Sequence, residues 1–294
     1  MWTDFQPLTF QRDGVTLFAR QGGPSDSGRP PLLLLHGHPQ TMAMWHRVAP
    51  TLARDRRVVL MDLRGYGDSD RPPASEASAA YAKREMARDA VALMQSLGHE
   101  RFAVLAHDRG ARVAHRMALD HPQAVTRLML LDIAPTLAMY EGTTEAFARG
   151  YWHWFFLILP APRPERLIEA DAIAYLREGM GQRGGDIFDP AAWAEYERSI
   201  VRPGSAAAIC ADYRASAGID LEHDRADRAA GRRVTQPLHV LWGANGVVGK
   251  CFEPLKLWQA AAEQVSGRAV DSGHYIAEEA PEVVLAEAQS FFGD

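Results

Sequence analysis

Short apolar runs alternate along the chain with segments whose apolar residues recur at the helical period. Continuous apolar runs are typical of strands that are buried on both faces, and they occur at 32–36, 57–62, 102–106, 128–132 and 237–243. Strands that alternate with helices in one sheet require right-handed crossovers. The pattern therefore predicts an α/β fold in which a mostly parallel sheet carries helices on both faces.

The two ends of the chain and one helix-period segment add further elements. The first twenty residues alternate polar and apolar positions around Asp13-Gly14, which predicts a β-hairpin. Residues 83–97 place their apolar side chains on one helical face before Gly98. Towards the C-terminus we expect a helix around 254–265, a strand at 268–274 that ends at His274, and a last amphipathic helix from Pro281.

The alternation of strands and helices stops after Pro135. Residues 136–235 contain helical stretches and loops but no convincing strand, and Pro and Gly interrupt them repeatedly. The strand pattern resumes at 237–243. We therefore predict one core built from residues 1–135 and 236–294, with a helical cap, 136–235, inserted between its two parts.

The most informative segment is 102–120, where an apolar strand leads into a sharp turn and then a helical pattern. Small residues, Ala106 and Gly110, stand two positions before and two positions after Asp108. This is the arrangement of a nucleophile elbow, whose strained turn has no room for large flanking side chains. A carboxylate nucleophile forms an ester that water can cleave, whereas a serine attacking an alkyl carbon would form a stable ether. Asp108 therefore predicts displacement at an alkyl carbon.

Two arginines follow the predicted nucleophile within the first turn of the helix. Arg109 and Arg112 lie where the positive end of the helix dipole disfavours cations by several tenths of a kcal/mol, so their presence indicates an anion. The alternative is pairing with surface carboxylates, which is the interpretation we prefer for Arg116.

Several polar residues stand at the carboxyl ends of the predicted strands, which meet in one crevice of an open α/β sheet. They are Asp108, Asp132, His274 and the loop at 36–39. A late histidine suits a general base, and such a base needs an orienting carboxylate. No Asp or Glu follows the strand at 237–243 before Glu253, so Asp132 is the remaining candidate.

Composition narrows the function classes. The chain of 294 residues is 47% hydrophobic and 23% charged with a net charge of −5, which argues against a nucleic-acid or membrane-surface binder. Its two cysteines and the lack of a basic-then-apolar leader predict a cytoplasmic protein without disulfides. The apolar stretch 151–162 is too short to span a membrane and is interpreted as a cap helix facing a pocket. No zinc-type or phosphate-binding spacing occurs, so no metal and no cofactor are predicted.

Seven motifs together resemble the haloacetate dehalogenases of the α/β-hydrolase superfamily, a group that includes the fluoroacetate dehalogenases. The motifs are HGHPQT at 36–41, DLRGYGDSD at 62–70, HDRGARV at 107–113, LDIAPT at 131–136, YWHWFF at 151–156, DYRA at 212–215 and SGHYIAEEAP at 272–281. The resemblance covers nearly the whole chain. It implies an α/β-hydrolase fold with an inserted cap, a 2-haloacid substrate and water as the second reactant.

The resemblance also assigns roles to individual residues. It implies that Asp108 displaces halide and that His274, held by Asp132, activates the water that hydrolyses the ester to give glycolate. The amides of His38 and Arg109 would form an oxyanion hole, and Arg109 and Arg112 would bind the substrate carboxylate. The halide would be bound by His153, Trp154 and Tyr213, which are donors without a full charge. Dimerisation is also typical of this family.

Two positions depart from the family pattern. Ala106 stands where the family usually has Gly, and it is still small enough for the elbow. His38 stands where the family has an aromatic residue, commonly Phe. A polar side chain at that place beside the substrate would alter the polarity of the pocket or the size of substrate it prefers.

Three other functions fit parts of the sequence. An epoxide hydrolase shares the Asp nucleophile, the His base and the HGxP loop, but it protonates the opening oxygen with two cap tyrosines, where this chain has His153 and Trp154. A haloalkane dehalogenase typically has Trp directly after the nucleophile, where this chain has Arg109. A non-catalytic protein that senses small acids commonly loses the nucleophile or the base, and this chain keeps both.

Overall fold

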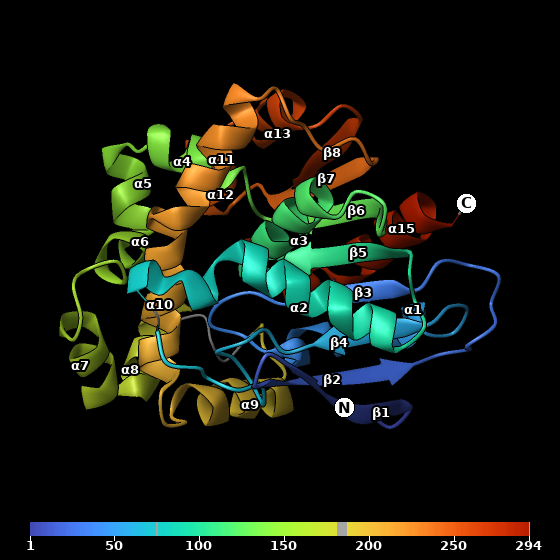
Figure 1. Ribbon diagram of the computed structural model, residues 1–294, viewed down its shortest axis with the longest axis horizontal. Coiled ribbons are helices and arrows are strands. Elements are labelled where there is room, and N and C mark those ends of the chain that lie inside the picture. The colour runs from blue at the N-terminus through green and yellow to red at the C-terminus, as the bar shows by residue number, and fades with distance from the viewer. Residues whose placement is uncertain (75, 181–186, 294) are drawn as a thin grey trace.

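The computed structural model describes residues 1–74, 76–180 and 187–293. Its centre is an eight-stranded sheet with the order β1-β2-β4-β3-β5-β6-β7-β8 (Figure 1). Strands β1 and β2 form an antiparallel hairpin, and β2 also pairs antiparallel with β4. All other neighbouring strands pair in parallel. The strands are β1 (Phe5–Arg12), β2 (Val15–Gly22), β3 (Leu32–Leu35), β4 (Val58–Met61), β5 (Phe102–His107), β6 (Val125–Leu131), β7 (Leu238–Gly243) and β8 (Val265–Val270).

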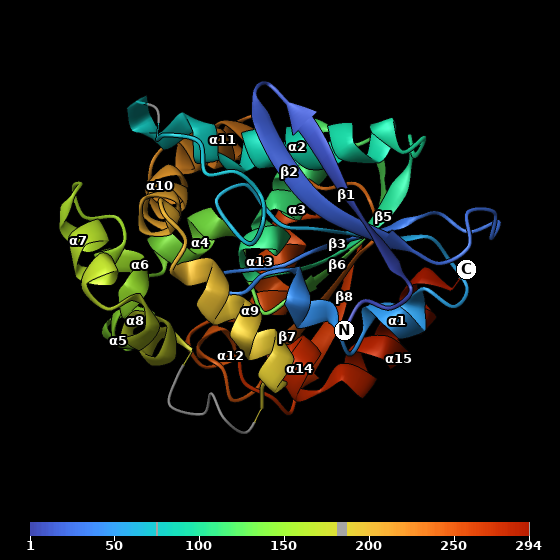
Figure 2. The same cartoon turned by 90° about the horizontal axis from the view of Figure 1, so that it is seen from below.

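Helices cover both faces of this sheet, which explains the continuous apolar runs. Helices α2 (Lys83–Ser96) and α3 (Asp108–Asp120) lie on one face, and α1 (Ala49–Leu52) and α15 (Pro281–Phe292) lie on the other (Figures 1 and 2). Every residue of β3, β4 and β5 is buried. A strand that is covered on both faces has no solvent-facing side and so needs no polar alternation.

Between β6 and β7 the described chain forms helices joined by turns and loops, with one isolated β-bridge from Val234 to Ala262. These helices gather beyond the carboxyl ends of the parallel strands, where they cover the edge that carries Asp108 (Figures 1 and 2). They are α4 (Thr136–Glu141), α5 (Glu145–Gly150), α6 (Trp152–Phe156), α7 (Arg163–Ala170), α8 (Ala172–Gly179), α9 (Pro190–Ile200), α10 (Ser205–Ala217) and α11 (Ile219–Ala229). The remaining short helices are η1 (Met42–Trp45), η2 (Glu76–Tyr81), α12 (Val247–Cys251), α13 (Pro254–Ala261) and α14 (Ile276–Glu279).

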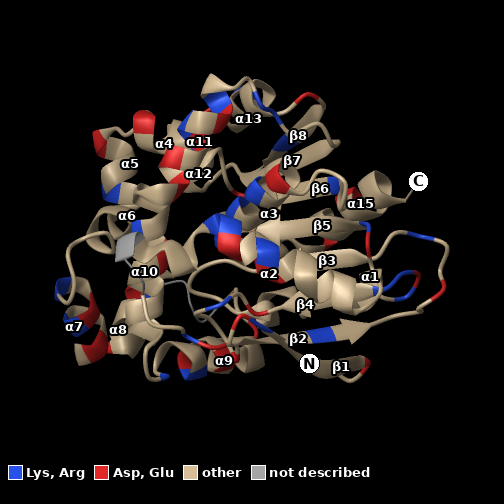
Figure 3. Cartoon of the chain, viewed as in Figure 1, with Lys and Arg blue, Asp and Glu red and all other residues tan. Residues whose placement is uncertain are grey.

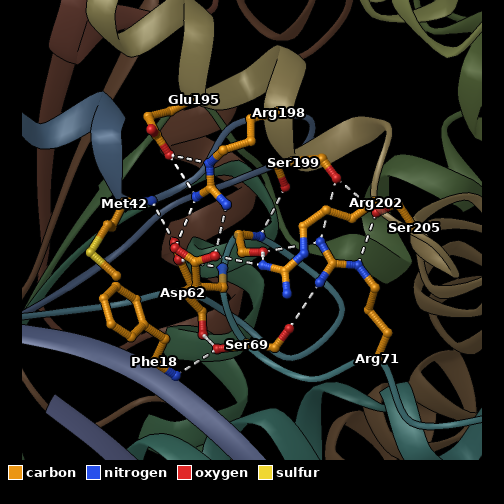
Figure 4. Close-up of polar contacts among 12 residues, drawn as sticks. Phe18, Met42, Asp62, Ser69, Arg71, Glu195, Arg198, Ser199, Arg202 and Ser205 are labelled. Carbon is orange, nitrogen blue, oxygen red and sulfur yellow. Dashed lines mark hydrogen bonds and ion pairs between the residues drawn. The ribbon is translucent and has the colours of Figure 1, made fainter.

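Ion pairs attach helix α9 to the loop that follows β4 (Figure 4). Arg198 donates two hydrogen bonds of 2.8 Å to Asp68, and Arg202 donates to the main-chain oxygen of Gly67 at 2.7 Å. Gly67 has a φ of +52°, and a Cβ there would lie 2.0 Å from an oxygen of Asp62. A glycine is therefore required at this turn.

The last strand differs from the sequence prediction. Strand β8 runs from Val265 to Val270 and pairs with β7, so it begins earlier than 268 and ends four residues before His274. Helix α13 accordingly ends at Ala261. The strand ends with its partner, because β7 ends at Gly243 and the last pair of the two strands is Gly243 with Val270. His274 therefore sits in a loop.

Acidic and basic residues lie side by side on the outer helices, as α2, α7 and α9 show in Figure 3. This interspersed pattern on α2, α7 and α9 agrees with the modest net charge of −5. Among the residues that the structure describes, no helix is long and apolar enough to cross a membrane.

Candidate active site

Asp108 lies at the turn between β5 and α3, and its backbone has a φ of +41°. A non-glycine residue in this left-handed region is strained, which is the property of a nucleophile elbow. The turn has little space on its far side. A Cβ at Gly110 would lie 2.4 Å from the His36 carbonyl oxygen and 2.6 Å from that of Leu35. Any larger residue at this position would push the elbow away from β3.

The loop after β3 holds one oxygen of the Asp108 carboxylate. The His38 amide donates a hydrogen bond of 3.1 Å to Asp108 Oδ2. A Cβ at Gly37 would lie 2.5 Å from Asp108 Cβ and 3.1 Å from the Arg109 amide nitrogen, so this loop, Asp108 and the next amide are closely packed. The arrangement leaves Asp108 Oδ1 as the oxygen without a main-chain donor from this loop.

Asp108 is ionised at neutral pH. Burial by itself would raise the pKa of the Asp108 carboxyl. The positive charges of His274, Arg112 and Arg109 lower this pKa by a larger amount, so it lies below its ordinary value. An ionised carboxylate is the form that attacks carbon.

His274 and Asp132 form a second polar pair at the same edge of the sheet. His274 Nδ1 lies 2.5 Å from Asp132 Oδ2, and the Gly243 amide donates to Asp132 Oδ1 at 2.9 Å. Burial lowers the pKa of His274, but the hydrogen bond and charge of Asp132 raise it by more. Donation from Nδ1 to Asp132 leaves Nε2 as the nitrogen that can accept a proton.

A cavity of about 330 Å³ connects these groups to helices between β6 and β7. Its lining includes Asp108, His274, His38, Tyr151 and His153. The cavity therefore contains a buried carboxylate and a basic histidine, together with neutral polar side chains from another part of the chain. This combination is typical of a small-molecule site.

The two predicted carboxylate-binding arginines have internal partners. Arg109 donates from Nε to Asp212 Oδ2 at 2.9 Å and from Nη2 to Asp212 Oδ1 at 2.8 Å, and its guanidinium lies 4.1 Å from the Tyr213 ring centroid. For Arg109 the anion indicated by the sequence is therefore, in this structure, the Asp212 side chain. Arg116 was expected to pair with surface carboxylates, but its partners are the buried Asp227 and the half-buried Asp224.

Arg112 is less completely engaged than Arg109. Its Nη1 donates to Thr136 Oγ1 at 2.8 Å and to the Ala134 carbonyl oxygen at 3.2 Å, and its guanidinium lies 4.7 Å from the Trp154 ring centroid. Its Nε is buried without a hydrogen-bond partner. A buried guanidinium with an unused N–H is costly unless another acceptor, such as a ligand, is bound.

His153, Trp154 and Tyr213 come together although they lie on different helices. His153 and Trp154 belong to α6 and Tyr213 to α10, and the Tyr213 ring centroid lies 5.8 Å from that of His153 and 6.5 Å from that of Trp154. Within residues 1–74, 76–180 and 187–293, these three side chains make ring contacts, and no side-chain hydrogen bond joins them to another residue. Burial lowers the pKa of His153 to about 3, so its imidazole is neutral at pH 7.

Comparison with known proteins shows which family this chain belongs to. The model of the alpha/beta hydrolase fold matches residues 30–281. A soluble epoxide hydrolase from Corynebacterium sp. (strain C12) is 34% identical, over 89% of this chain and 90% of that protein. A crystal structure of a protein from Nostoc sp. PCC 7120, assigned to the α/β hydrolases, has a TM-score of 0.94 with 46% identity over 99% of each chain. A fluoroacetate dehalogenase from Burkholderia sp. is 42% identical, over 100% of this chain and 96% of that protein. The chain belongs to the haloacetate dehalogenase family of the α/β-hydrolase superfamily.

Membership in the haloacetate dehalogenase family confirms both the predicted family and the predicted α/β-hydrolase fold. Family membership also supports hydrolase activity for this protein. The substrate and the roles of individual residues are not decided by family membership, because epoxide hydrolases resemble the same chain.

The sequence prediction missed several residues that shape the site. Asp212 stands within the DYRA motif beside Tyr213, so the motif was a signal, but its partner Arg109 lies 103 positions away. Tyr151 places its hydroxyl 3.2 Å from His274 Nδ1. Tyr175, on α8, places its hydroxyl 3.3 Å from His38 Nε2. No local pattern pairs such residues, because each contact joins two separate elements.

His38, the departure from the family pattern, has a neutral side chain inside the site. Burial lowers its pKa to about 4, and its Nδ1 is buried without a partner. Its main-chain amide contacts Asp108 whatever the side chain is. The side chain instead lines the cavity near His153, with ring centroids 6.2 Å apart.

Proposed function

We propose that this protein hydrolyses a haloacetate to glycolate and halide through an ester formed on Asp108. The observation that carries the proposal is the composition of one cavity wall. An ionised Asp108 and a held His274 line this cavity together with the neutral imidazole of His153. The Tyr213 ring packs against the rings of His153 and Trp154, which brings two further neutral donors close to it. Donors of this kind suit a leaving halide, because full positive charges would hold it too tightly.

In the first step, Asp108 Oδ1 attacks the α-carbon of the haloacetate. A carbon–oxygen bond forms as the carbon–halogen bond breaks with inversion, and the halide leaves with the bonding electron pair. The His38 amide stays on Oδ2 and keeps Oδ1 aimed at the substrate. Hydrogen bonds from His153, Trp154 and Tyr213 would strengthen as negative charge develops on the halogen.

In the second step, water attacks the carbonyl carbon of the Asp108 ester. His274 Nε2 takes a proton from this water, and Asp132 stabilises the imidazolium that results. The amides of His38 and Arg109 hold the tetrahedral oxyanion. Its collapse breaks the bond to the glycolate oxygen, which takes the proton from His274, and Asp108 is regenerated with one oxygen from water.

The helices between β6 and β7 would act as the cap in this reaction. We propose residues 136–235 as the cap and residues 1–135 and 236–294 as the two parts of the core. The division assigns the nucleophile, the base and the orienting acid to the core, and the leaving-group donors to the cap. Support comes from the position of α6 and α10 beyond the strand ends (Figure 1).

Arg109 and Arg112 are proposed to bind the substrate carboxylate with the N–H groups that their internal partners leave unused. Each charge-assisted hydrogen bond contributes about 1.5–3 kcal/mol. We expect Arg112→Lys to raise KM for chloroacetate about 10- to 100-fold, because lysine keeps the charge and loses the planar fork. Steady-state chloride release measures this change. Wild-type protein that turns over chloroacetamide as well as chloroacetate would contradict the clamp.

Trp154 is proposed to stabilise the leaving halide through its indole N–H. Fluoride is small, strongly hydrated and a poor leaving group, so it depends on each donor more than chloride does. We expect Trp154→Phe to lower kcat for fluoroacetate about 10- to 100-fold, because this is the rate effect of losing one hydrogen bond to a charged group. The same substitution should lower kcat for chloroacetate much less.

Trp152→Phe is the matched control for this prediction, because Trp152 lies on the same helix and lines the same cavity but is not one of the proposed halide donors. Fluoride and chloride release are measured for both variants, together with their thermal unfolding. An equal fall for the two substrates in Trp154→Phe would mean that the indole shapes the cavity and does not stabilise the halide.

Epoxide hydrolysis is the second candidate, and the Tyr151 hydroxyl favours it because it lies in the cavity beside His274. An epoxide would need a hydroxyl proton for its opening oxygen and no carboxylate site. Purified protein incubated with fluoroacetate, chloroacetate and an uncharged epoxide separates the two functions. Halide release without diol formation supports the dehalogenase, and diol formation without halide release rejects it.

A further inference from the structure

A buried carboxylate joins three parts of the protein close to the site. Glu278 lies on α14, which begins two residues after His274, and its side chain contacts Gln40 and Tyr196. Gln40 belongs to the loop whose His38 amide holds Asp108. Tyr196 belongs to α9, a helix of the segment between β6 and β7. All three side chains are buried.

The hydrogen bonds among these residues form a closed triangle. Gln40 Nε2 donates to Glu278 Oε1 at 2.9 Å and to the Tyr196 hydroxyl at 3.2 Å, and the Tyr196 hydroxyl makes a short hydrogen bond with Glu278 Oε1. The chain positions that meet here are separated by 156 and 238 residues. A shift of any one of the three elements must therefore stretch contacts to the other two.

We propose that Glu278 is a positioning residue, which through Gln40 and Tyr196 keeps the oxyanion-hole loop, the His274 loop and helix α9 in mutual register during the reaction. None of the three residues contacts Asp108. The inference rests on the proposed function, because it assumes that His38 and His274 act in one reaction.

The geometry of the triangle favours the neutral acid form of Glu278. An ionised carboxylate accepts hydrogen bonds on both oxygens, but both donors reach Oε1, and Oε2 is buried without a partner. In the described part of the chain, no salt bridge joins Glu278 to a cation. Arg47 donates to its main-chain oxygen at 2.7 Å and not to its carboxyl group. An anion at this place would be buried and half unsatisfied.

Burial raises the pKa of Glu278 to about 8. The Tyr196 hydroxyl and the charge of Arg47 lower this pKa, whereas the charges of Asp189 and Glu279 raise it. Tyr275, beside them on the same segment, has a pKa well above its ordinary value because of burial. As the pH rises through about 8, Glu278 loses its proton and the triangle gains an uncompensated charge. His274 does not cause such an alkaline loss, because a base becomes more available as the pH rises.

Glu278→Gln tests the proposal because glutamine has the same shape as the neutral acid and does not titrate. The wild type should lose kcat for chloroacetate as the pH rises through about 8, with little change in KM, whereas Glu278→Gln should keep kcat over the same range. Tyr196→Phe removes a donor that stabilises the ionised form, so its alkaline loss should move to higher pH. Glu282→Gln, an exposed carboxylate on α15, is the matched control and should behave like wild type.

Stability provides a second measurement. The pKa of Glu278 is raised in the folded state, so its contribution is complete below the ordinary carboxyl value of 4.5 and is lost as the pH rises to about 8. Over that window the unfolding equilibrium constant of wild type should rise, relative to Glu278→Gln, by up to about tenfold per pH unit.

The two measurements separate the possible failures. Wild type without halide release from any haloacetate at pH 7 overturns the proposed function and the positioning role with it. Wild type that is active, but has the same alkaline profile and the same pH-dependent stability as Glu278→Gln, overturns the positioning role alone.

Discussion

Replacing Asp108 with asparagine should abolish halide release from haloacetates, with a loss of about 10⁴-fold or more in kcat. The amide is nearly isosteric with the carboxylate and can keep the contact to the His38 amide, so folding should be little affected. It lacks the negative charge that attacks the α-carbon. Halide release, measured beside the thermal unfolding of both proteins, tests the expectation.

Isotope labelling tests the same step in the unaltered protein. In a single turnover in heavy-oxygen water, the product should receive its new oxygen from Asp108, and the label should enter the Asp108 carboxyl group. Mass spectrometry of the peptide that contains Asp108 detects it. Label that appears directly in glycolate would mean that water attacks carbon, and the ester mechanism would be rejected.

His274→Gln should separate the two halves of the reaction. Alkylation of Asp108 needs no base, whereas ester hydrolysis needs a group that takes the proton from water. The variant should therefore release halide once and then stop, with the mass of one carboxymethyl group added to the protein. The arrest arises because glutamine cannot accept the proton that His274 Nε2 accepts in wild type.

Intact-protein mass spectrometry after substrate addition measures this adduct. The double variant with Asp108→Asn is its control, because it should form no adduct. A folded His274→Gln protein that neither releases halide nor gains mass would show that the histidine acts before or during alkylation. The proposed division of the reaction would then be wrong.

Local sequence patterns were sufficient for the sheet and for the turn at Asp108. The runs at β3, β4 and β5 read as buried strands because helices cover both faces, so each strand carries its own signal in consecutive residues. Asp108 was recognisable because a strained turn needs small neighbours within two positions, such as Gly110. By contrast, the end of β8 was placed too late, since its limit is set by the end of its partner β7 at Gly243 and not by its own residues.

The sequence by itself therefore determined the elements, the family and the set of polar residues at the strand ends. Only the tertiary structure decided which other side chains pair in and around the site. It gave Arg109 an internal partner in Asp212, and it brought Gln40, Tyr196 and Glu278 into one buried triangle. The physical reason is that strands and turns depend on residues that are neighbours in the chain. Buried polar side chains instead pair with whichever partner the fold brings within hydrogen-bond distance. Residues 103 or 238 positions apart carry no local pattern that records that distance.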